Sequence, residues 1–211
     1  ELLCNGILGD DHTIVESARV SYLGESKGEE KDKKLLGYLL AHRHTSPFEM
    51  VEFAFRIKAP IFVFRQWHRH RVAEFNEWSA RYSELKEEFY IPSEWRAQDK
   101  RNKQSSIPAE LDHAALSAQL EDACRAAFGT YEQMLASGVA RELARMVLPL
   151  NTYSVMMFKM NAHALMHFID LRAAPDAQFE IREYARLLYE EFFKPALPWT
   201  AEFWKTVNGE Q

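Results

Sequence analysis

The chain has 211 residues, of which 47% are hydrophobic, 13% aromatic and 27% charged, and its formal net charge is −5. This composition predicts a globular protein, either one large domain or two halves that share a core, and excludes a mainly disordered chain. The sequence shows no membrane-spanning run and no secretion signal, and its acidic total argues against a protein that binds polymeric nucleic acid. Two distant cysteines, Cys4 and Cys124, form no CxxC pattern, so we expect a reducing, cytoplasmic location.

Two helices are predicted in the N-terminal region. Residues Asp11–Tyr22 have helical apolar periodicity, and Asp10 or Asp11 can cap the helix. Leu35–Leu40 has the pattern of a second helix. The charged segment Gly24–Lys34 between them has no apolar period, so we expect an exposed turn there.

A strand and a helix are predicted next. Val51–Lys58 alternates apolar and polar residues, which is typical of a half-buried antiparallel strand. Pro60 is well placed to open a helix over Ile61–Arg71. The polar segment Trp95–Ser106 has no period and is predicted to be a surface loop.

The second half is mainly helical. Helical patterns cover Pro108–Ser137 and Val139–Leu148, separated by Gly138. Asn151–Met160 is rich in Tyr, Val, Met and Phe and can form a second core strand. Helices over Ala162–Leu171 and Asp176–Phe193 complete the pattern. We therefore predict the α+β class, with a largely antiparallel sheet flanked by helices, in a single domain over residues 1–211.

A basic segment at residues 65–81 carries four arginines and two histidines against two glutamates. Arginine presents a planar fork of donors that matches phosphate oxygens. A solvated basic helix end is the simpler interpretation. It does not explain the polar and aromatic residues in the same segment, which are Gln66, Trp67, Asn76, Glu77, Ser79 and Arg81. A nucleotide fits them better, with phosphate on Arg and Ser, base on Gln and ribose on Glu.

Arg69-His70-Arg71, followed after seven residues by Ser79, resembles the signature of the flavin-dependent thymidylate synthases. Three further segments are similar to motifs of this family, in the same order along the chain. They are His44 to Glu49, Arg141 to Asn151, and Asn161 to Arg172. The resemblance extends from about Val15 to Trp199.

This resemblance implies a protein that binds FAD in a cleft built by several subunits of a homotetramer. It implies dUMP as substrate, with NADPH and 5,10-methylenetetrahydrofolate as co-substrates, and dTMP as product. No resident metal, nucleic-acid polymer or membrane is implied as partner. By position in the motifs, the implied flavin contacts are His44 (also near the folate), Ser46, Glu49, Arg69, His70, Arg71, Glu77, Asn161, His163 and His167.

The nucleotide contacts are carried over from the family in the same way. They are Gln66, Arg69, Glu77, Ser79, Ala80, Arg81, Arg145 and Arg172. Arg172 matches the arginine that holds the uracil ring in its N3-deprotonated form, and it is the implied catalytic residue. A fixed guanidinium beside N3 and O2 stabilises the negative charge that builds on the pyrimidine. Neither cysteine lies in a motif, so we expect no cysteine nucleophile, and we assign Ser79 to phosphate binding.

Several positions depart from the family pattern. Met50 stands where His is common, His68 where a bulky apolar residue is common, and Ala80 where Gly is common. His163 replaces a common Arg and His167 a common Asn, and both are implied flavin contacts.

Two other functions fit parts of the sequence. His163 and His167 share a helical face, and Asp170 follows three residues later, which is a spacing of metal ligands. A metal-dependent phosphohydrolase acting on nucleotides is therefore one alternative, although few carboxylates accompany the arginines. The other is a non-enzymatic nucleotide- or nucleic-acid-binding module that stacks bases on aromatic rings between arginines. Glu74 and Glu77 within the segment argue against a polyanion track.

Overall fold

The computed structural model describes the backbone of residues 1–208 and the side chains of residues 1–205. The last residues of the predicted 1–211 domain lie outside the described part. The described chain forms two compact units. Unit 1 comprises Glu1, Ile57–Arg69 and Asn76–Met156, and unit 2 comprises Leu2–Arg56, His70–Phe75 and the chain from Met157 onward.

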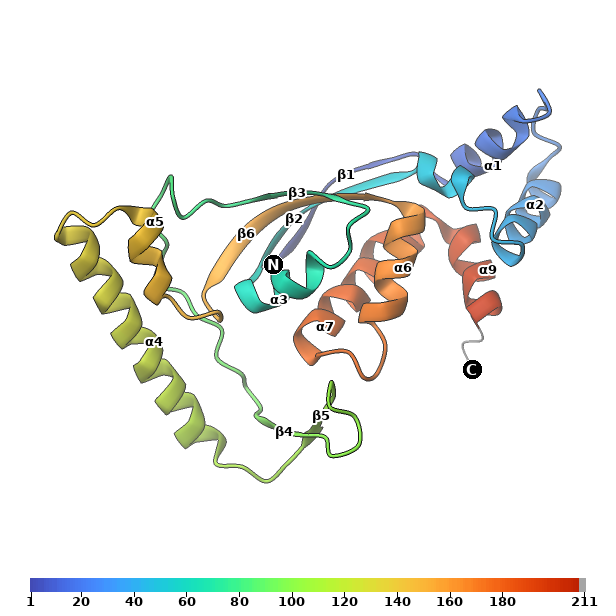
Figure 1. The fold of residues 1–211 in the computed structure, drawn as a ribbon. Helices are drawn as coiled ribbons and strands as arrows, with labels where there is room; N and C mark the ends of the chain where they lie inside the picture. The colour runs from blue at the N-terminus through green and yellow to red at the C-terminus, as the bar shows by residue number, and fades with distance from the viewer. Residues whose placement is uncertain (209–211) are drawn as a thin grey trace. The chain divides into compact units, whose positions relative to one another are not determined.

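The main sheet has the strand order β1-β2-β6-β3 among the described residues (Figure 1). Its strands are β1 (Leu2–Leu8), β2 (Glu52–Pro60), β6 (Tyr153–Asn161) and β3 (Glu74–Glu77). Backbone bonds join Ile61 N–H to Thr152 O, 3.0 Å, and Ala162 N–H to Val51 O, 2.8 Å. Because the end of each strand pairs with the start of the other, β2 and β6 are antiparallel.

The two central strands bury alternate side chains. The alternation predicted for Val51–Lys58 is present in β2, and the core strand predicted at Asn151–Met160 is β6. The alternating buried residues are Phe53, Phe55, Ile57 and Ala59 in β2, where the terminal Pro60 is also buried, and Ser154, Met156, Phe158 and Met160 in β6. Period-two burial is what a sheet with one face on the core requires, so both strand predictions are confirmed.

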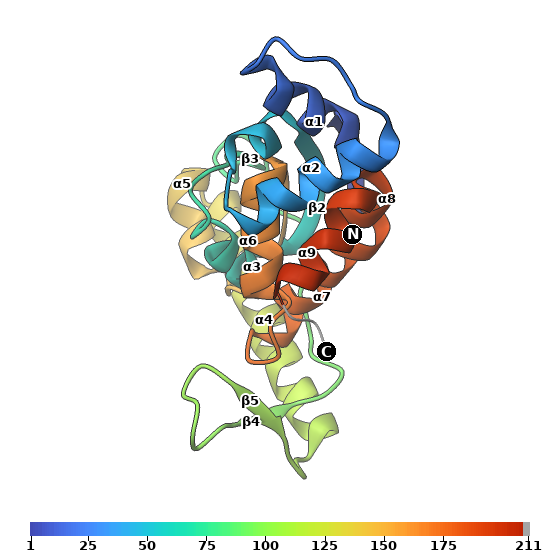
Figure 2. The same ribbon diagram turned by 90° about the vertical axis from the view of Figure 1, so that its right-hand side faces the viewer.

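Unit 2 contains helices from both ends of the chain. They are α1 (Asp11–Val20), α2 (Glu29–Ala41), the 3-10 helix η1 (Ser46–Met50), α6 (Ala162–Arg172), α7 (Phe179–Leu187), the π-helix η3 (Leu188–Phe193), α8 (Lys194–Ala196) and α9 (Pro198–Asn208). Helix α2 packs on α1 and α9, and α6 packs on η1 and α7 (Figure 2). The N-terminal helices and the C-terminal helix are therefore folded together.

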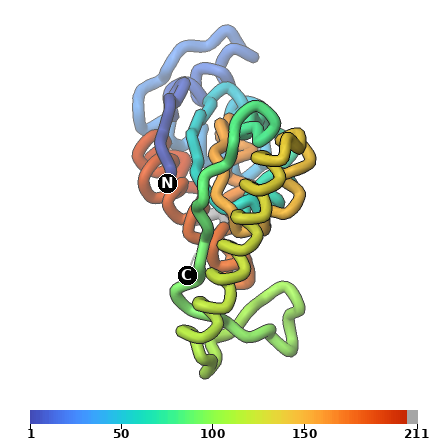
Figure 3. The backbone as a smooth tube through the Cα atoms, turned by 90° about the vertical axis from the view of Figure 1, so that its left-hand side faces the viewer, coloured from blue at the N-terminus to red at the C-terminus, as the bar shows by residue number. Residues whose placement is uncertain are grey.

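Unit 1 contains α3 (Ile61–Trp67), α4 (His113–Ala136), α5 (Arg141–Ala144) and the 3-10 helix η2 (Arg145–Val147), with the antiparallel hairpin β4 (Arg96–Gln98) and β5 (Ser106–Pro108). Figure 3 shows the long α4 and the hairpin near its start. Trp95 joins the two, since its backbone N–H donates to His113 and its indole N–H to Ser117. Phe128 and Tyr131 of α4 are buried and pack against Ala144 of α5.

The predicted turn at Gly24–Lys34 is wrong over its second half, because α2 begins at Glu29. Charged residues form this first turn without an apolar face. Their helix is supported by the i,i+4 ion pairs Glu29–Lys33 and Glu30–Lys34, and acidic residues favour a helix N-terminus. The rest of the helix prediction for Leu35–Leu40 is confirmed.

Other boundaries also differ from the predictions. The surface loop predicted at Trp95–Ser106 contains the short β4 and the start of β5, which pair with each other and need no apolar alternation. Helix α3 ends at Trp67, short of Arg71, and α4 begins at His113, after its N-cap Asp112. The helix predicted at Val139–Leu148 is reduced to α5 and η2.

Strands β1 and β3 and helix α9 are among the elements that were not predicted. Strand β1 is exposed along nearly its whole length, and β3 is only four residues long, so neither has a clear alternating pattern. Helix α9 begins at Pro198, and proline is a favourable residue at the first position of a helix. The predicted helices Ala162–Leu171 and Asp176–Phe193 are present as α6 and as α7 with η3.

The described chain is a mixture of helices and antiparallel sheet, as predicted for the α+β class. No helix in the described part of the chain is both long and apolar enough to cross a membrane.

Candidate active site

Unit 1 contains a cavity of about 520 Å³ next to α3. Four of the predicted nucleotide contacts line it, namely Glu77, Ser79, Ala80 and Arg145. Its apolar wall is formed by Ile61, Phe64, Leu85, Met146, Leu148 and Leu150. The volume lies within the range of about 300–1,000 Å³ that is common for small-molecule pockets. A lining that combines apolar side chains with Arg, Ser and Glu suits a ligand with a planar base and an anionic end.

The segment after β3 places the serine and its neighbours in this cavity. Trp78 N–H donates to Val155 O of β6, 2.8 Å, which fixes the end of β3. The chain then turns, with Tyr82 N–H donating to Ser79 O, 3.1 Å. The Ser79 hydroxyl oxygen accepts from the Arg81 N–H, 3.3 Å. The turn therefore brings Ser79 and Ala80 to the cavity lining.

Three predicted nucleotide contacts of unit 1 do not line this cavity: Gln66, Arg69 and Arg81. Arg69 is exposed, beyond the end of α3. Arg81 lies 57% exposed and forms an ion pair with Glu142, 3.4 Å. An exposed ion pair of this kind contributes little to stability, so Arg81 can change partner without a large cost.

The cavity also includes polar residues that the sequence did not single out as contacts. Arg65 and His68 of the α3 region and Ser154 of β6 line it. Arg65 and Arg145 thus bring two guanidinium-bearing residues to one cavity. A signal in the sequence could have identified Arg65 and His68. Ile61, Arg65 and His68 are spaced by four and then three residues along α3 and its C-cap, so they lie on one face of the helix.

Unit 2 contains a separate cavity of about 410 Å³. Three predicted flavin contacts line it, His44, His163 and His167. Arg43, Thr45, Phe48 and Asp170 contribute to the same lining, together with Leu39, Leu40, Met166 and Trp204. The cavity therefore combines imidazoles and a guanidinium with an aromatic and aliphatic wall.

The end of α2 positions His44. Arg43 adopts the left-handed conformation with φ 55°, which ends the helix. His44 N–H then donates to Leu39 O, 2.9 Å, and Arg43 N–H to Leu40 O, 3.1 Å, the pattern of a Schellman cap. A non-glycine residue in this conformation costs about 1–2 kcal/mol, so the rest of the turn must enforce it. The turn carries Arg43 and His44 to the cavity wall.

The start of α6 positions the other two histidines. The Asn161 side-chain oxygen accepts from Ala164 N–H, 2.8 Å, and so caps the helix. His163 and His167 follow on one face of α6, four residues apart, and both line the cavity. The predicted contact Asn161 thus has a structural role as the N-cap, and its contact with flavin stays a prediction.

The remaining predicted flavin contacts are distributed over both units. Ser46 and Glu49 are exposed on η1, and Arg71 is exposed after His70. Arg69 and Glu77 belong to unit 1. None of these five lines the unit 2 cavity. Their flavin contacts stay predictions.

His70 is buried, with 8% of its surface exposed. Its Nε2 accepts a hydrogen bond from Arg172 Nε, 2.9 Å. The ring lies 4.7 Å from Phe168 and 5.8 Å from His167, measured between centroids. Burial, reinforced by Arg172 and then by His167, lowers the pKa of His70 to about 4. The structure therefore joins two predicted site residues, one from the signature and one from the end of α6.

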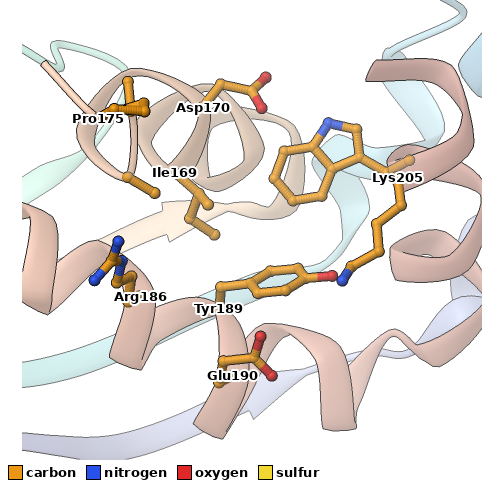
Figure 4. A pocket seen from close by; sticks show the side chains of 10 residues that line it. Ile169, Asp170, Pro175, Arg186, Tyr189, Glu190 and Lys205 are labelled. Carbon is orange, nitrogen blue, oxygen red and sulfur yellow. The ribbon is translucent and has the colours of Figure 1, made fainter. Parts of the chain in front are cut away.

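Unit 2 has a further cavity of about 580 Å³ whose lining comes from α6, the segment that follows it, α7, η3 and α9 (Figure 4). Tyr189, Lys205 and Arg186 are among its lining residues, and the Lys205 ammonium lies 5.3 Å from the Tyr189 ring centre. None of the predicted flavin or nucleotide contacts lines it. Asp170 and Trp204 line both this cavity and the histidine cavity, so α9 borders the histidine cavity, which the sequence did not indicate.

The metal-like spacing of His163, His167 and Asp170 has no matching cluster in the structure. Among the described residues, no group of three or more His, Cys, Asp or Glu side chains is arranged to hold a metal ion.

The chain is similar to known proteins over nearly its whole length. Residues 3–199 match the family model of the thymidylate synthase complementing protein. A flavin-dependent thymidylate synthase of Thermus thermophilus is 57% identical over 183 residues, which cover 87% of this chain and 67% of that protein. The corresponding enzyme of Thermosipho africanus is 46% identical over 199 residues, covering 93% and 86%.

A solved structure agrees with this relationship. The UMP/dUMP methylase PolB from Streptomyces cacaoi, bound with 5-Br dUMP, has a TM-score of 0.89 and 35% sequence identity, over 98% of this chain and 94% of that one. The match over residues 3–199 places the chain in the class of the thymidylate synthase complementing proteins. Within it, the chain belongs to the flavin-dependent thymidylate synthase family.

Proposed function

We propose that the chain converts dUMP to dTMP with FAD as cofactor, NADPH as reductant and 5,10-methylenetetrahydrofolate as one-carbon donor. The observation that carries the proposal is the unit 1 cavity, which Glu77, Ser79 and Arg145 line together with apolar side chains. The bound ligand of the PolB structure is a brominated dUMP. That nucleotide has the planar base and the phosphate that this cavity suits.

In this proposal the phosphate lies at the polar side of the unit 1 cavity. Arg145 and the turn at Ser79 supply a guanidinium, a hydroxyl and backbone groups, which are the usual donors to a phosphate. Glu77 accepts from the ribose hydroxyl, and Ala80 leaves space for the sugar. Gln66, Arg69 and Arg81 lie outside the described cavity and would contact dUMP from its rim.

Arg172 has the proposed catalytic role. Methylation at C5 requires negative charge to build on the pyrimidine, and a guanidinium beside N3 and O2 stabilises that charge. The proposed chemistry needs no cysteine nucleophile. Cys124 is buried within α4 and accepts a hydrogen bond from Asn151, 3.2 Å, and Cys4 is an exposed residue of the edge strand β1.

The residues of the unit 2 cavity fit a flavin. Flavin rings present hydrogen-bond acceptors on an otherwise apolar plane, and the diphosphate is anionic. Histidine and arginine donors beside Phe48 and Trp204 match both properties. His44, His163 and His167 would hold the cofactor there. Flavin contacts of Ser46, Glu49, Asn161, Arg69, Arg71 and Glu77 belong to the proposal through the family resemblance alone. When bound, FAD carries hydride between NADPH and the pyrimidine.

We also propose a cytoplasmic homotetramer whose active sites are shared between subunits. Exposed apolar residues support assembly, because large exposed apolar patches mark contact surfaces. In unit 1 such residues include Tyr82, Leu143, Met146 and Leu150, which are close in sequence to the proposed nucleotide contacts.

The direct test is anaerobic dTMP formation from dUMP, methylenetetrahydrofolate and NADPH, with and without added FAD. We expect dTMP only in the presence of FAD, and we expect a chain with Cys4→Ser and Cys124→Ser to retain this activity. Product without any flavin, or loss of product in the folded double-serine chain, would contradict the proposal. Stoichiometric metal with hydrolysis of dUMP would favour the phosphohydrolase instead.

The unit 1 cavity is tested by a matched pair of arginines. Arg145 lines the cavity, whereas Arg141, four residues earlier, pairs with Glu84 at 3.5 Å on the surface. We expect Arg145→Ala to raise the dissociation constant for dUMP by about 10- to 100-fold, since a charge-assisted hydrogen bond is worth about 1.5–3 kcal/mol. Arg141→Ala is expected to leave dUMP binding unchanged. Isothermal titration of both variants with dUMP measures this, and equal weakening would place the phosphate elsewhere.

A further inference from the structure

The hydrogen bond between His70 and Arg172 connects two segments that are 102 residues apart in sequence. His70 follows α3, and Arg172 is the last residue of α6. Both residues belong to unit 2. The His70 ring packs against Phe168, one turn before Arg172 on α6, and so cannot rotate freely. The imidazole is therefore a fixed acceptor for the Arg172 side chain.

The chemistry of the two groups determines which tautomer of His70 is present. Arginine Nε is only a donor, so the Nε2 atom of His70 must carry a lone pair. A neutral imidazole with an unprotonated Nε2 carries its proton on Nδ1. The pKa of His70 is lowered to about 4 by burial, by Arg172 and by His167. The acceptor is thus intact at neutral pH.

We propose that His70 is a positioning residue for Arg172, because its Nε2 atom fixes the plane of the guanidinium that meets the pyrimidine. This inference rests on the proposed role of Arg172. A guanidinium held only by its own side chain samples many rotamers. One held at Nε by a buried ring is oriented before charge develops on the substrate, and such preorganisation is what makes electrostatic stabilisation effective.

This role differs from the flavin contact that the family resemblance implies for His70. A flavin contact would affect cofactor affinity first. A positioning role affects turnover at saturating flavin and saturating dUMP. A role in packing alone would be retained by any ring of similar size that fills the space beside Phe168. The three roles therefore predict different results for one pair of substitutions.

The pair is His70→Phe and His70→Gln. Phenylalanine keeps a ring but has no acceptor, whereas glutamine has a side-chain oxygen that can accept from Arg172 Nε. We expect His70→Phe to lower kcat about 10- to 100-fold at saturating substrates, the effect of a slightly misplaced catalytic group. We expect His70→Gln to recover most of this loss. The dissociation constant for FAD, measured by fluorescence quenching, should be nearly the same in both variants as in the wild-type chain.

Two results would overturn the inference. If His70→Phe weakens FAD binding and excess FAD restores kcat, His70 acts through the flavin. If both variants retain wild-type kcat, with circular dichroism confirming that they are folded, the acceptor is not needed. Absence of dTMP from the wild-type chain would instead refute the proposed function, so the two failures are distinguishable.

The tautomer gives a test that does not depend on activity. The charged and titratable groups described beside His70 are Arg172 and His167, both on α6. We expect ¹⁵N NMR of His70-labelled protein at pH 7 to show a protonated Nδ1 and an unprotonated Nε2. Arg172→Met should shift the Nε2 resonance. A protonated Nε2 at pH 7 would exclude it as the acceptor and refute the inference.

Discussion

Replacing Arg172 by alanine is expected to reduce kcat for dTMP formation by about 10²–10³-fold, the usual effect of removing one preorganised donor from a site of developing charge. The physical reason is that the guanidinium is the proposed partner of the pyrimidine N3 and O2. The loss should be in kcat, with a smaller change in KM for dUMP, because the charge develops mainly in the transition state. Steady-state rates at saturating FAD and dUMP measure it.

Arg172→Lys is the matched control for this prediction. Lysine keeps the charge but lacks the planar fork and the Nε donor that His70 accepts from. We therefore expect a loss intermediate between wild type and alanine. A folded Arg172→Ala chain that forms dTMP at the wild-type rate would eliminate the catalytic assignment.

The sequence predicted best where burial alone determines the structure. Strands β2 and β6 alternate because every second side chain enters the core, so the pattern is visible without any structure. It predicted poorly those strands that are held by backbone hydrogen bonds to a neighbouring strand and that bury few side chains. Strand β1 is exposed almost throughout and is held at the sheet edge by backbone bonds, and the β4–β5 hairpin is likewise held by its own ladder. Backbone hydrogen bonds leave no signal in side-chain periodicity.

The first turn of α2 was missed for a related reason. Charged residues from Glu29 to Lys34 lack an apolar face, yet ion pairs four residues apart and the continuing apolar helix support them. In addition, Asp32 is buried and accepts from Arg19 and Ser26, so the start of α2 is fixed to α1 and the loop. A long-range contact of this kind cannot be inferred from local spacing.

The candidate site was predictable as a set of residues but not as a set of cavities. Motif matching selected Glu77, Ser79, Ala80 and Arg145, which line one cavity of unit 1. It also selected His44, His163 and His167, which line a different cavity of unit 2. The motifs could not show this division, because the signature itself crosses it. Arg69 and Ser79 belong to unit 1, and His70 and Arg71 belong to unit 2.

The largest stability effect is expected for Asp11, whose carboxylate caps α9 from a distance of 188 residues in sequence. It accepts from Trp199 N–H at 2.7 Å, Thr200 N–H at 3.1 Å and the Thr200 hydroxyl at 2.6 Å. Thr200 is fully buried. Asp11→Ala should lower the free energy of unfolding by about 2–4 kcal/mol, through the lost cap and the buried donors left without an acceptor. Urea denaturation followed by tryptophan fluorescence measures this.

The Asp11→Asn variant removes the charge of the side chain while keeping its shape, so it shows how much of the effect is due to the charge. Asparagine keeps one acceptor oxygen, so the loss of stability at pH 7 should be smaller for Asp11→Asn than for Asp11→Ala.

Burial raises the pKa of Asp11, although the hydrogen bonds from Thr200 and Trp199 oppose this. The folded state then holds the proton more tightly than the unfolded state. The stability that protonated Asp11 adds is therefore fully present below the ordinary pKa of 3.8. That added stability is lost as pH rises through the raised pKa of the folded state. Wild type should therefore exceed Asp11→Asn in stability by more at acid pH than at pH 7. A gap that widens as pH rises would show that hydrogen bonding to the carboxylate outweighs its burial.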